Sequence, residues 1–430
     1  MAMVGAVGRG QRLDRAFAAE SSGLAPRERA WCRELVYGAQ RLRGRLDHLV
    51  DRKVPRGPDS VDSTLRDVLR LALYEIFHMD GVPEYAAVSQ AVELARSAGG
   101  KGAAGFANAV LRATIRDGGG REHFPDIEAD PAGFFSTWGS HPRWLVDRWL
   151  RRWSPEEVRR LVEANNAVPP ITLRCLRHSP EEAVKLFGEA GIETESVGTD
   201  TGCVVLLGET SLVEAMAVVP CVVQDPAAAL VVPYADPERE DRVADLCSAP
   251  GGKAMALAAR GNMVLAADRS RERLRLVQQN VARLARESWG GSGFRVFVVQ
   301  SDALAPAVEG AEMVLVDVPC TGTGTLRRNP DTRWRLTDAR MNELVALQGR
   351  ILECSANVVP RGGRLVYSTC SLEPEENEDR ISRFLEGHPD FELEPGVGVE
   401  DAHLDQRGQL YLLPQVHGFD GAFAARLRKR

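Results

Sequence analysis

Two of the eight cysteines occupy positions where a thiol could act on a ligand. Cys320 and Cys370 each follow an apolar run of strand-like composition, at residues 313–316 and 364–369. Parallel strands end at one edge of their sheet, so both sulfurs should lie at the same edge. The closest two cysteines in the chain are 16 residues apart, which excludes a Cys-x-x-Cys motif and a zinc-knuckle spacing. We therefore expect free thiols and no metal.

The other six cysteines carry no comparable signal. A lone cysteine is most often a small buried hydrophobic residue. We interpret five of them in this way: Cys32, Cys175, Cys203, Cys221 and Cys354. Cys247 lies in the glycine-containing turn considered next, and no chemical role of its own is predicted for it.

That turn, between a predicted strand and a predicted helix, could hold a small ligand. After Asp245 and Leu246 it consists of Cys247, Ser248, Ala249, Pro250, Gly251, Gly252 and Lys253. A phosphate-binding P-loop would need glycine at position 247 and serine or threonine at 254, where the chain has cysteine and alanine. A dinucleotide fingerprint needs three spaced glycines, and only two adjacent ones are present. S-adenosylmethionine remains as the predicted cofactor, because it has no pyrophosphate and needs only a close backbone turn with acids for its ribose and adenine.

Three acids follow successive strands of the same region. Asp268 ends the second strand, where a carboxylate can accept hydrogen bonds from both ribose hydroxyls. Asp302 follows the third strand, placed for the adenine edge, and Asp317 ends the fourth. A single aspartate at a strand end is usually a cap or a turn former. Three on the ligand side of one sheet favour a binding site.

Thiols beside a methyl sulfonium indicate one kind of reaction. Carbon five of a pyrimidine is too weak a nucleophile to take a methyl group directly. A thiolate that adds to carbon six gives an enamine-like adduct, whose carbon five can attack the methyl group. A base must then remove the proton from carbon five, and the thiol must leave. Two thiols fit this sequence, one bonding and one assisting release, and the chemistry alone does not say which is which.

The elements that must position these residues begin with a helical region. Residues 12–115 carry apolar positions at helical spacing, which predicts an all-α bundle with helices over 27–49, 64–79, 88–95 and 106–115. Glycines at 118–120 and the acidic stretch that runs to 133 predict a linker. Two short helices are predicted within 141–165.

Two further regions contain strands. Strands over 171–176, 194–197, 204–207 and 221–224, with a helix over 180–190 capped by Ser179, predict a small α+β module of ferredoxin-like size. Later strands over 243–246, 264–267, 294–300, 313–316 and 364–369 alternate with helices over 254–260 and 271–286, and a last strand lies near 423–427. This alternation predicts a doubly wound α/β domain with a parallel sheet. The predicted domains are residues 1–120, 134–235 and 236–430.

The net charge of −6 over 430 residues conceals an uneven distribution. Residues 373–405 hold twelve acids and two arginines, so the remainder is basic on balance. Arginines concentrate at 143–160 and at 327–335, which fits binding to a polyanion despite the acidic total. No apolar run approaches the ~18 residues of a membrane span. Residues 2–7 make a poor signal peptide, so we expect a cytoplasmic protein without membrane contact.

These motifs resemble the signatures of the Sun-type RNA cytosine methyltransferases. The likeness rests on residues 246–253, 317–320 and 368–377, and on residues 327–331 with Trp334, which are similar to the segment after the Pro-Cys motif of that family. Residues 82–95 and 105–112 resemble the NusB-like N-terminal domain of one branch. The connecting region of that branch is similar to residues 141–145, 163–166 and 223–226. Together the matches cover most of the chain.

The resemblance implies an S-adenosylmethionine-dependent enzyme that methylates carbon five of a cytosine in 16S rRNA. It implies a NusB-like helical bundle, a ferredoxin-like module and a C-terminal Rossmann-like domain, in a protein whose basic N-terminal bundle and arginines at 143–160 and 327–335 bind RNA backbone. We also expect a monomer. It assigns Cys370 as the nucleophile and Cys320 as the thiol that assists product release. It also implies that residues 247–253, Asp268, Asp302 and Asp317 hold the cofactor, with Asp317 facing the target base as well.

The sequence departs from the family pattern at its N-terminal end, and it leaves two alternative functions open. The NusB-like domain of the family opens with a long amphipathic helix, whereas residues 1–11 here are weakly patterned and the helix near 13–19 is short. The alternatives are a tRNA cytosine-5 methyltransferase with the same chemistry and a catalytically silent RNA-binding factor for ribosome assembly. The intact acids and paired cysteines argue against the silent factor, and the NusB-like stretch favours rRNA over tRNA by resemblance.

Overall fold

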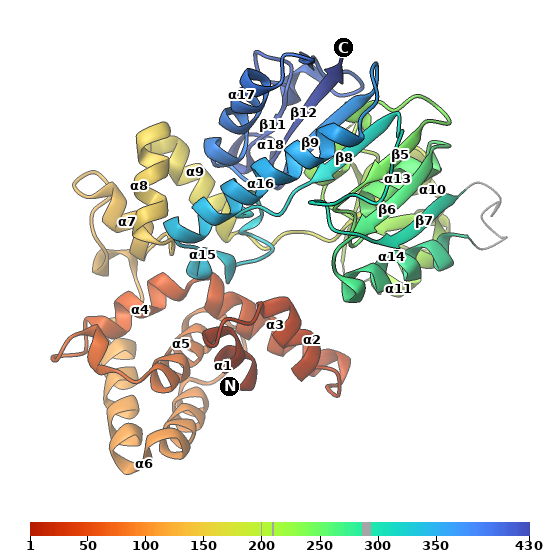
Figure 1. Cartoon of the computed structure of the whole chain (residues 1–430). Helices are drawn as coiled ribbons and strands as arrows, with labels where there is room; N and C mark the ends of the chain where they lie inside the picture. The colour runs from red at the N-terminus through yellow and green to blue at the C-terminus, as the bar shows by residue number, and fades with distance from the viewer. Residues whose placement is uncertain (199, 209, 286–293) are drawn as a thin grey trace. The chain divides into compact units, whose positions relative to one another are not determined.

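The chain divides into two compact units (Figure 1). The computed structural model describes residues 1–198, 200–208, 210–285 and 294–430. The N-terminal unit comprises Met1–Val168 and Leu326–Leu336, and the C-terminal unit comprises Pro169–Thr325 and Thr337–Arg430. Within the described ranges, no helix has both the length and the apolar character that a membrane crossing requires.

The N-terminal unit is helical throughout, as the periodicity predicts. Its helices are α1 (Ala2–Gly8), α2 (Leu13–Glu20), α3 (Pro26–Arg41), α4 (Arg43–Asp51), α5 (Ser63–His78), α6 (Glu84–Asp117), α7 (Pro131–Thr137), α8 (Arg143–Arg152), α9 (Pro155–Asn166) and α15 (Thr332–Arg335), with short 3₁₀ turns η1 (Pro58–Ser60) and η2 (Arg121–His123). One apolar core is shared by α1 to α6, with Leu46, Leu69, Leu73 and Leu111 fully buried in it.

Three details of this unit differ from the sequence expectation. The helix expected over 27–49 is two helices, because Leu42 has φ −98° and ψ 16° between α3 and α4. The weakly patterned start forms α1, whose Met3, Val4 and Val7 are buried against the core. The stretch expected as a linker up to residue 133 contains η2 and the first residues of α7, so part of it is ordered helix.

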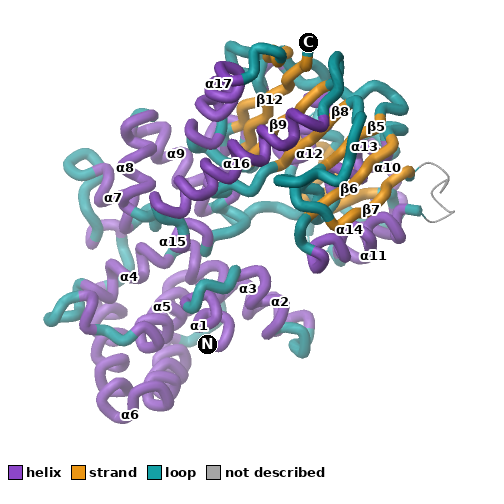
Figure 2. The backbone as a smooth tube through the Cα atoms, viewed as in Figure 1, coloured by secondary structure: helices purple, strands orange, loops and turns teal. Residues whose placement is uncertain are grey.

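Among the described residues the C-terminal unit contains two sheets, and Figure 2 shows strands of the larger one. The smaller is built from β1 (Thr172–Cys175), β2 (Thr194–Val197), β3 (Cys203–Leu206) and β4 (Cys221–Val223), all antiparallel in the order β2-β3-β1-β4. Helix α10 (Pro180–Glu189) connects β1 to β2, and α11 (Leu212–Val218) connects β3 to β4. This βαββαβ order is the ferredoxin-like arrangement, which confirms the predicted module. Ser179 caps α10 by accepting from the Glu182 N–H, as predicted.

The larger sheet has eight strands and carries the predicted parallel core. It consists of β5 (Arg242–Asp245), β6 (Met263–Asp268), β7 (Arg295–Gln300), β8 (Met313–Asp317), β9 (Arg364–Thr369), β10 (Phe391–Glu394), β11 (Leu410–Leu412) and β12 (Ala422–Lys429). The order is β10-β12-β9-β8-β5-β6-β7, with β11 paired to β12. Strands β5 to β9 are parallel, whereas β10, β11 and β12 add an antiparallel edge. The last strand predicted near 423–427 is β12, whereas β10 and β11 were not predicted.

Helices cover both faces of this sheet, as a doubly wound fold requires. One face packs against α12 (Pro226–Ala235), α13 (Gly252–Ala259) and α14 (Arg271–Leu284), and the other against α16 (Asp338–Val358) and α17 (Glu378–Gly387). Met313 and Leu315 of β8 point into the first core, and Val314 and Val316 point into the second. Burial on both faces explains why the parallel strands are continuous apolar runs. Position 286, the expected end of α14, lies outside the described residues.

The segment Leu326–Leu336 leaves the C-terminal unit and packs inside the N-terminal one. Its Arg333 is fully buried. The Arg333 guanidinium donates to the carbonyls of Ser140 (2.9 Å) and Asn165 (3.1 Å) and to the side-chain oxygen of Asn166 (2.8 Å). The indole N–H of Trp334 donates to the carbonyl of Gln40 at 2.9 Å. This segment, hereafter the insertion, is therefore a structural part of the helical unit.

Candidate active site

The residues predicted to do chemistry gather at the carboxyl edge of the parallel strands. The glycine-containing turn follows β5, Asp268 ends β6, and Asp302 follows β7. Asp317 ends β8 and precedes Cys320, and Cys370 directly follows β9. In open α/β sheets this edge is where ligands bind.

The two predicted thiols are in contact. Cys320 Sγ lies 3.4 Å from Cys370 Sγ, a hydrogen-bonding distance for sulfur. The contact follows from the register of the sheet, because β8 and β9 are parallel neighbours with Asp317 opposite Ser368. Hydrogen bonding with Cys370, together with burial, raises the pKa of Cys320 well above its ordinary value. Cys320 therefore keeps its proton at neutral pH and can donate it to the sulfur of Cys370.

A buried carboxylate joins the loops that carry the two sulfurs. Glu376, on the turn η6 (Pro374–Glu376), is fully buried. It accepts the backbone N–H of Thr321 at 2.9 Å and also the Thr321 hydroxyl. Gln348 of α16 donates to both Glu376 (2.8 Å) and the carbonyl of Pro319 (2.9 Å). The loop around Cys320 is therefore fixed to the segment that follows Cys370.

The turn after β5 has the close backbone geometry that was predicted. Gly251 has φ +103°, a left-handed conformation that favours glycine, and it is the N-cap residue of α13. A Cβ on Gly252 would lie 2.9 Å from the side-chain amide of Gln224. Lys253, in the first turn of α13, donates to Asp317 Oδ2 at 2.6 Å, and Ser368 donates to Asp317 Oδ1 at 2.7 Å. The turn is thus linked to the β8 and β9 ends of the sheet.

The other two predicted acids differ in their surroundings. Asp268 is buried and accepts the N–H of Ala249 at 3.3 Å and of Ser270 at 2.8 Å, so it braces the turn after β5. Arg273 strengthens this link, because its guanidinium donates to the carbonyl of Ala249 and lies 3.4 Å from Asp268. Asp302 is exposed and accepts the N–H of Leu304 at 2.9 Å, as a turn-forming aspartate does.

A buried carboxylate without normal hydrogen bonds lies beneath the turn. Asp245 is 1 % exposed, and neither of its oxygens has a partner of normal geometry among the described residues. Burial raises the pKa of Asp245 to about 7. The hydroxyl of Ser248 is buried and likewise has no partner of normal geometry within the described chain. Burial also raises the pKa of Cys247, which argues against a reactive thiolate at that position.

These features fit the predicted cofactor. S-adenosylmethionine carries a cationic sulfonium, an ammonium group and several hydroxyls, and it needs acceptors and a close backbone approach. The unpaired polar atoms of Asp245 and Ser248, the positive φ of Gly251 and the carboxylate of Asp268 provide these. Among the described residues, no cluster of three or more histidine, cysteine or acidic side chains could hold a metal ion.

Three residues at this edge of the sheet had no role assigned from the sequence, and one role predicted elsewhere in the chain was wrong. Asp245, Glu376 and Gln348 had no assigned role, and only Glu376 carried a signal, since it lies six residues after Cys370. The expectation that the arginines at 327–335 bind RNA backbone is wrong for Arg333, which is fully buried and bonded to carbonyl oxygens.

The comparisons with known proteins define the class first. Residues 232–428 match the family described as 16S rRNA methyltransferase RsmB/F, so the larger sheet is a methyltransferase domain. Residues 6–116 match the NusB family, and residues 141–212 match the RsmF/B-like ferredoxin-like domain. The predicted Rossmann-like, NusB-like and ferredoxin-like parts are therefore confirmed, and the cofactor of this methyltransferase is S-adenosylmethionine, as predicted.

Relatives then identify the family. The chain is 33 % identical to a probable ribosomal RNA small subunit methyltransferase B of Synechocystis sp., over 97 % of this chain and 94 % of that one. It is 33 % identical to the ribosomal RNA small subunit methyltransferase B of Klebsiella pneumoniae subsp. pneumoniae, over 99 % and 95 %. The chain therefore belongs to the ribosomal RNA small subunit methyltransferase B family.

Solved structures agree with this assignment. The crystal structure of PH0851 superposes with a TM-score of 0.76 at 26 % identity, covering 100 % of this chain and 98 % of that chain. A methyltransferase homolog protein from Pyrococcus horikoshii gives a TM-score of 0.57 at 29 % identity, covering 68 % of this chain and 97 % of that chain.

Proposed function

We propose that the chain transfers a methyl group from S-adenosylmethionine to carbon five of a cytosine in 16S rRNA, through a covalent adduct with Cys370. The observation that carries the proposal is the 3.4 Å contact between the sulfurs of Cys320 and Cys370 at the carboxyl edge of the sheet. Methylation at an oxygen or an amine needs no thiol, whereas methylation at carbon five needs one to activate the ring and gains from a second.

The two thiols take different roles in this proposal. Cys320 keeps its proton because its pKa is raised, and its S–H can donate to the sulfur of Cys370. Such a hydrogen bond stabilises a thiolate on Cys370, which is the form that adds to carbon six. After methylation, the proton of carbon five passes to a base and the Sγ–carbon six bond breaks. The same hydrogen bond from Cys320 then stabilises the departing thiolate.

The remaining site residues hold the methyl donor and the target cytosine. The bound cofactor supplies an electrophilic methyl group. Residues 247–253, Asp268, Asp302 and Asp317 are proposed to hold it, and within this group Lys253 forms an ion pair with Asp317. The cytosine must be unpaired or flipped out of its helix, because stacking covers carbon six.

We further propose that the protein acts as a monomer in the cytoplasm. A particle mass near 47.0 kDa in solution would support the monomer.

The test uses protein-free 16S rRNA and bulk tRNA side by side, with S-adenosylmethionine labelled in its methyl group. Wild type is compared with Cys370→Ala, Cys320→Ala and the control Cys354→Ala, which lies on α16. We expect label in 16S rRNA, loss of label with Cys370→Ala, and a protein–RNA adduct on denaturing gels with Cys320→Ala. The control should behave as wild type.

Each other outcome changes a defined part of the proposal. Label in tRNA instead of rRNA would overturn the substrate and leave the chemistry intact. Adduct formation with Cys370→Ala would exchange the roles of the two thiols. RNA binding without label in either RNA would favour the silent assembly factor.

A further inference from the structure

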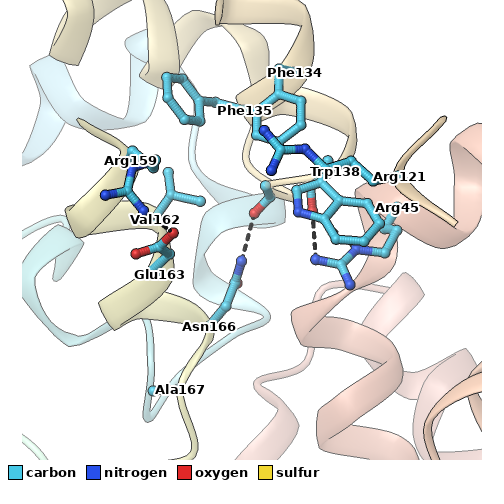
Figure 3. Close-up of a pocket in the computed structure, with 11 residues that line it drawn as sticks. Arg45, Arg121, Phe134, Phe135, Trp138, Arg159, Val162, Glu163, Asn166 and Ala167 are labelled. Carbon is cyan, nitrogen blue, oxygen red and sulfur yellow. Dashed lines mark hydrogen bonds and ion pairs between the residues drawn. The ribbon is translucent and has the colours of Figure 1, made fainter. Parts of the chain in front are cut away.

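A cavity in the N-terminal unit has the features of an anion site. Its volume is about 330 Å³, and Figure 3 shows residues of several helices around it. The lining comprises Arg45, Arg121, Phe134, Phe135, Trp138 and Gly139, with Arg159, Val162, Glu163, Asn166 and Ala167 of α9 and its C-terminal end. The lining thus contains three guanidinium groups and one carboxylate among aromatic and aliphatic side chains.

The charge of Arg45 is not balanced by the protein. Arg45 Nε and Nη2 both donate to the carbonyl of Trp138, at 3.0 and 2.9 Å, and its guanidinium lies 3.8 Å from the centroid of the Trp138 ring. Among the described residues, no carboxylate forms an ion pair with Arg45. Partial burial lowers the pKa of Arg45 to about 10. Arg45 is partly buried, and a cation removed from water without a counter-ion is costly unless a ligand supplies the negative charge.

A second cation on the same side of the cavity is also available. Arg121 is exposed, lies 4.6 Å from the centroid of the Phe134 ring, and has no ion pair with any described residue. On the opposite wall, Arg159 is different, because Glu156 and Glu163 neutralise it at 2.6 and 2.7 Å. Figure 3 shows Arg45 and Arg121 beside Trp138, across the cavity from the Arg159–Glu163 pair. The unbalanced charge therefore lies on one wall.

We propose that this cavity is a binding subsite for a backbone phosphate of the RNA substrate, held by Arg45 and Arg121. The choice of RNA among anionic partners rests on the proposed function. A volume of about 330 Å³ is close to the lower end for ligand pockets, which suits one nucleotide and not an extended peptide. Guanidinium groups that are held in place by aromatic rings and a carbonyl lose little freedom when they bind a phosphate.

The experiment measures RNA affinity with variants of the full chain. The main variant is Arg121→Gln, because Arg121 is exposed and its replacement should not disturb folding. The matched control is Arg116→Gln, which removes the same charge from an exposed position of α6 outside the cavity. Labelled protein-free 16S rRNA is titrated with each protein between about 0.05 and 0.3 M KCl. Arg45→Lys, which keeps the charge and loses the paired donors, is a second variant whose folding is checked by its melting temperature.

We expect Arg121→Gln to weaken binding about tenfold and to reduce the slope of log affinity against log salt by about one. In the methylation assay, KM for 16S rRNA should rise by a similar factor while kcat stays constant, because the cavity contains no residue of the thiol or cofactor sites. The control should stay within twofold of wild type in both assays.

The outcomes separate this inference from the proposed function. Equal binding by Arg121→Gln and the control would overturn the phosphate subsite and leave the methylation proposal intact. Binding that depends on Arg121, without methyl transfer by wild type, would overturn the function and retain the subsite. A wild type with no affinity for 16S rRNA would overturn the subsite directly.

Discussion

The unpaired carboxylate of Asp245 predicts a specific pH dependence of stability. Burial raises its pKa from 3.8 to about 7. The folded protein therefore binds a proton between about pH 4 and 7 that the unfolded chain has released. This stabilisation is complete below about pH 4 and is lost as the pH rises through about 7. A shift of about three units corresponds to about 4 kcal/mol, of which about 3 kcal/mol falls between pH 5 and pH 8.

The replacement Asp245→Asn removes the titrating group and keeps its volume. For a unit of this size, 3 kcal/mol corresponds to a difference of about 6–12 °C in melting temperature. Raising the pH from 5 to 8 should lower the melting temperature of wild type more than that of Asp245→Asn. The expected difference between the two decreases is about 6–12 °C. Calorimetry without added cofactor measures these melting temperatures. A parallel scan with S-adenosylmethionine identifies the transition of the C-terminal unit, because the bound cofactor raises the melting temperature of that unit.

The control for this experiment is Asp390→Asn, which removes an exposed carboxylate from the same unit. It should leave the pH dependence of wild type unchanged. Identical pH dependence of wild type and Asp245→Asn would refute the argument, because the buried carboxylate would then be ionised in the folded protein at both pH values.

Three further changes test other parts of the structure. Glu376→Ala should lower the rate of single-turnover methylation about 10- to 100-fold and make the RNA adduct persist, because the loop around Cys320 is no longer held by Glu376. The control is Glu386→Ala at an exposed position, and a wild-type rate for Glu376→Ala would contradict the positioning role of Glu376. Lys253→Met should weaken S-adenosylmethionine binding about tenfold in calorimetric titration, because Asp317 loses its ion pair; affinity within twofold of wild type would count against it. Arg333→Ala should destabilise the N-terminal unit by about 3 kcal/mol or more, since several buried acceptors lose their donor; a change in melting temperature below about 1 °C would exclude this.

Much of the catalytic fold is predictable because its signal is local. The parallel strands are apolar runs that end in Asp, Cys or Gly-containing turns, and β5 to β9 all coincide with predicted strands. The carboxyl edge of the sheet then brings Cys320, Cys370 and Asp317 together without any knowledge of side-chain packing. The thiol contact is therefore a consequence of register, which the sequence motif encodes.

Other features depend on packing that the sequence does not display. Helix α16 was not predicted, and it buries polar Gln348 against the loop before Cys320. Asp245 looks like any aspartate at the end of a strand, and only the structure shows that it is buried without a hydrogen bond of normal geometry among the described residues. Arg333 belongs to a basic cluster that suggests RNA binding, yet a count of charges does not distinguish an exposed guanidinium from a buried one.

The insertion at Leu326–Leu336 has a consequence for how the chain can be divided. The backbone passes between the two units at three points, so one proteolytic cut after Val168 would leave the fragments joined by a buried arginine and a tryptophan instead of by a peptide bond. Such fragments should purify together. A shortened protein that begins at Pro169 would instead present the insertion to solvent without its acceptors, and should be less soluble than one in which residues 326–336 are also removed. A protein that lacks the N-terminal unit therefore also needs a change at residues 326–336, inside the sequence of the catalytic domain.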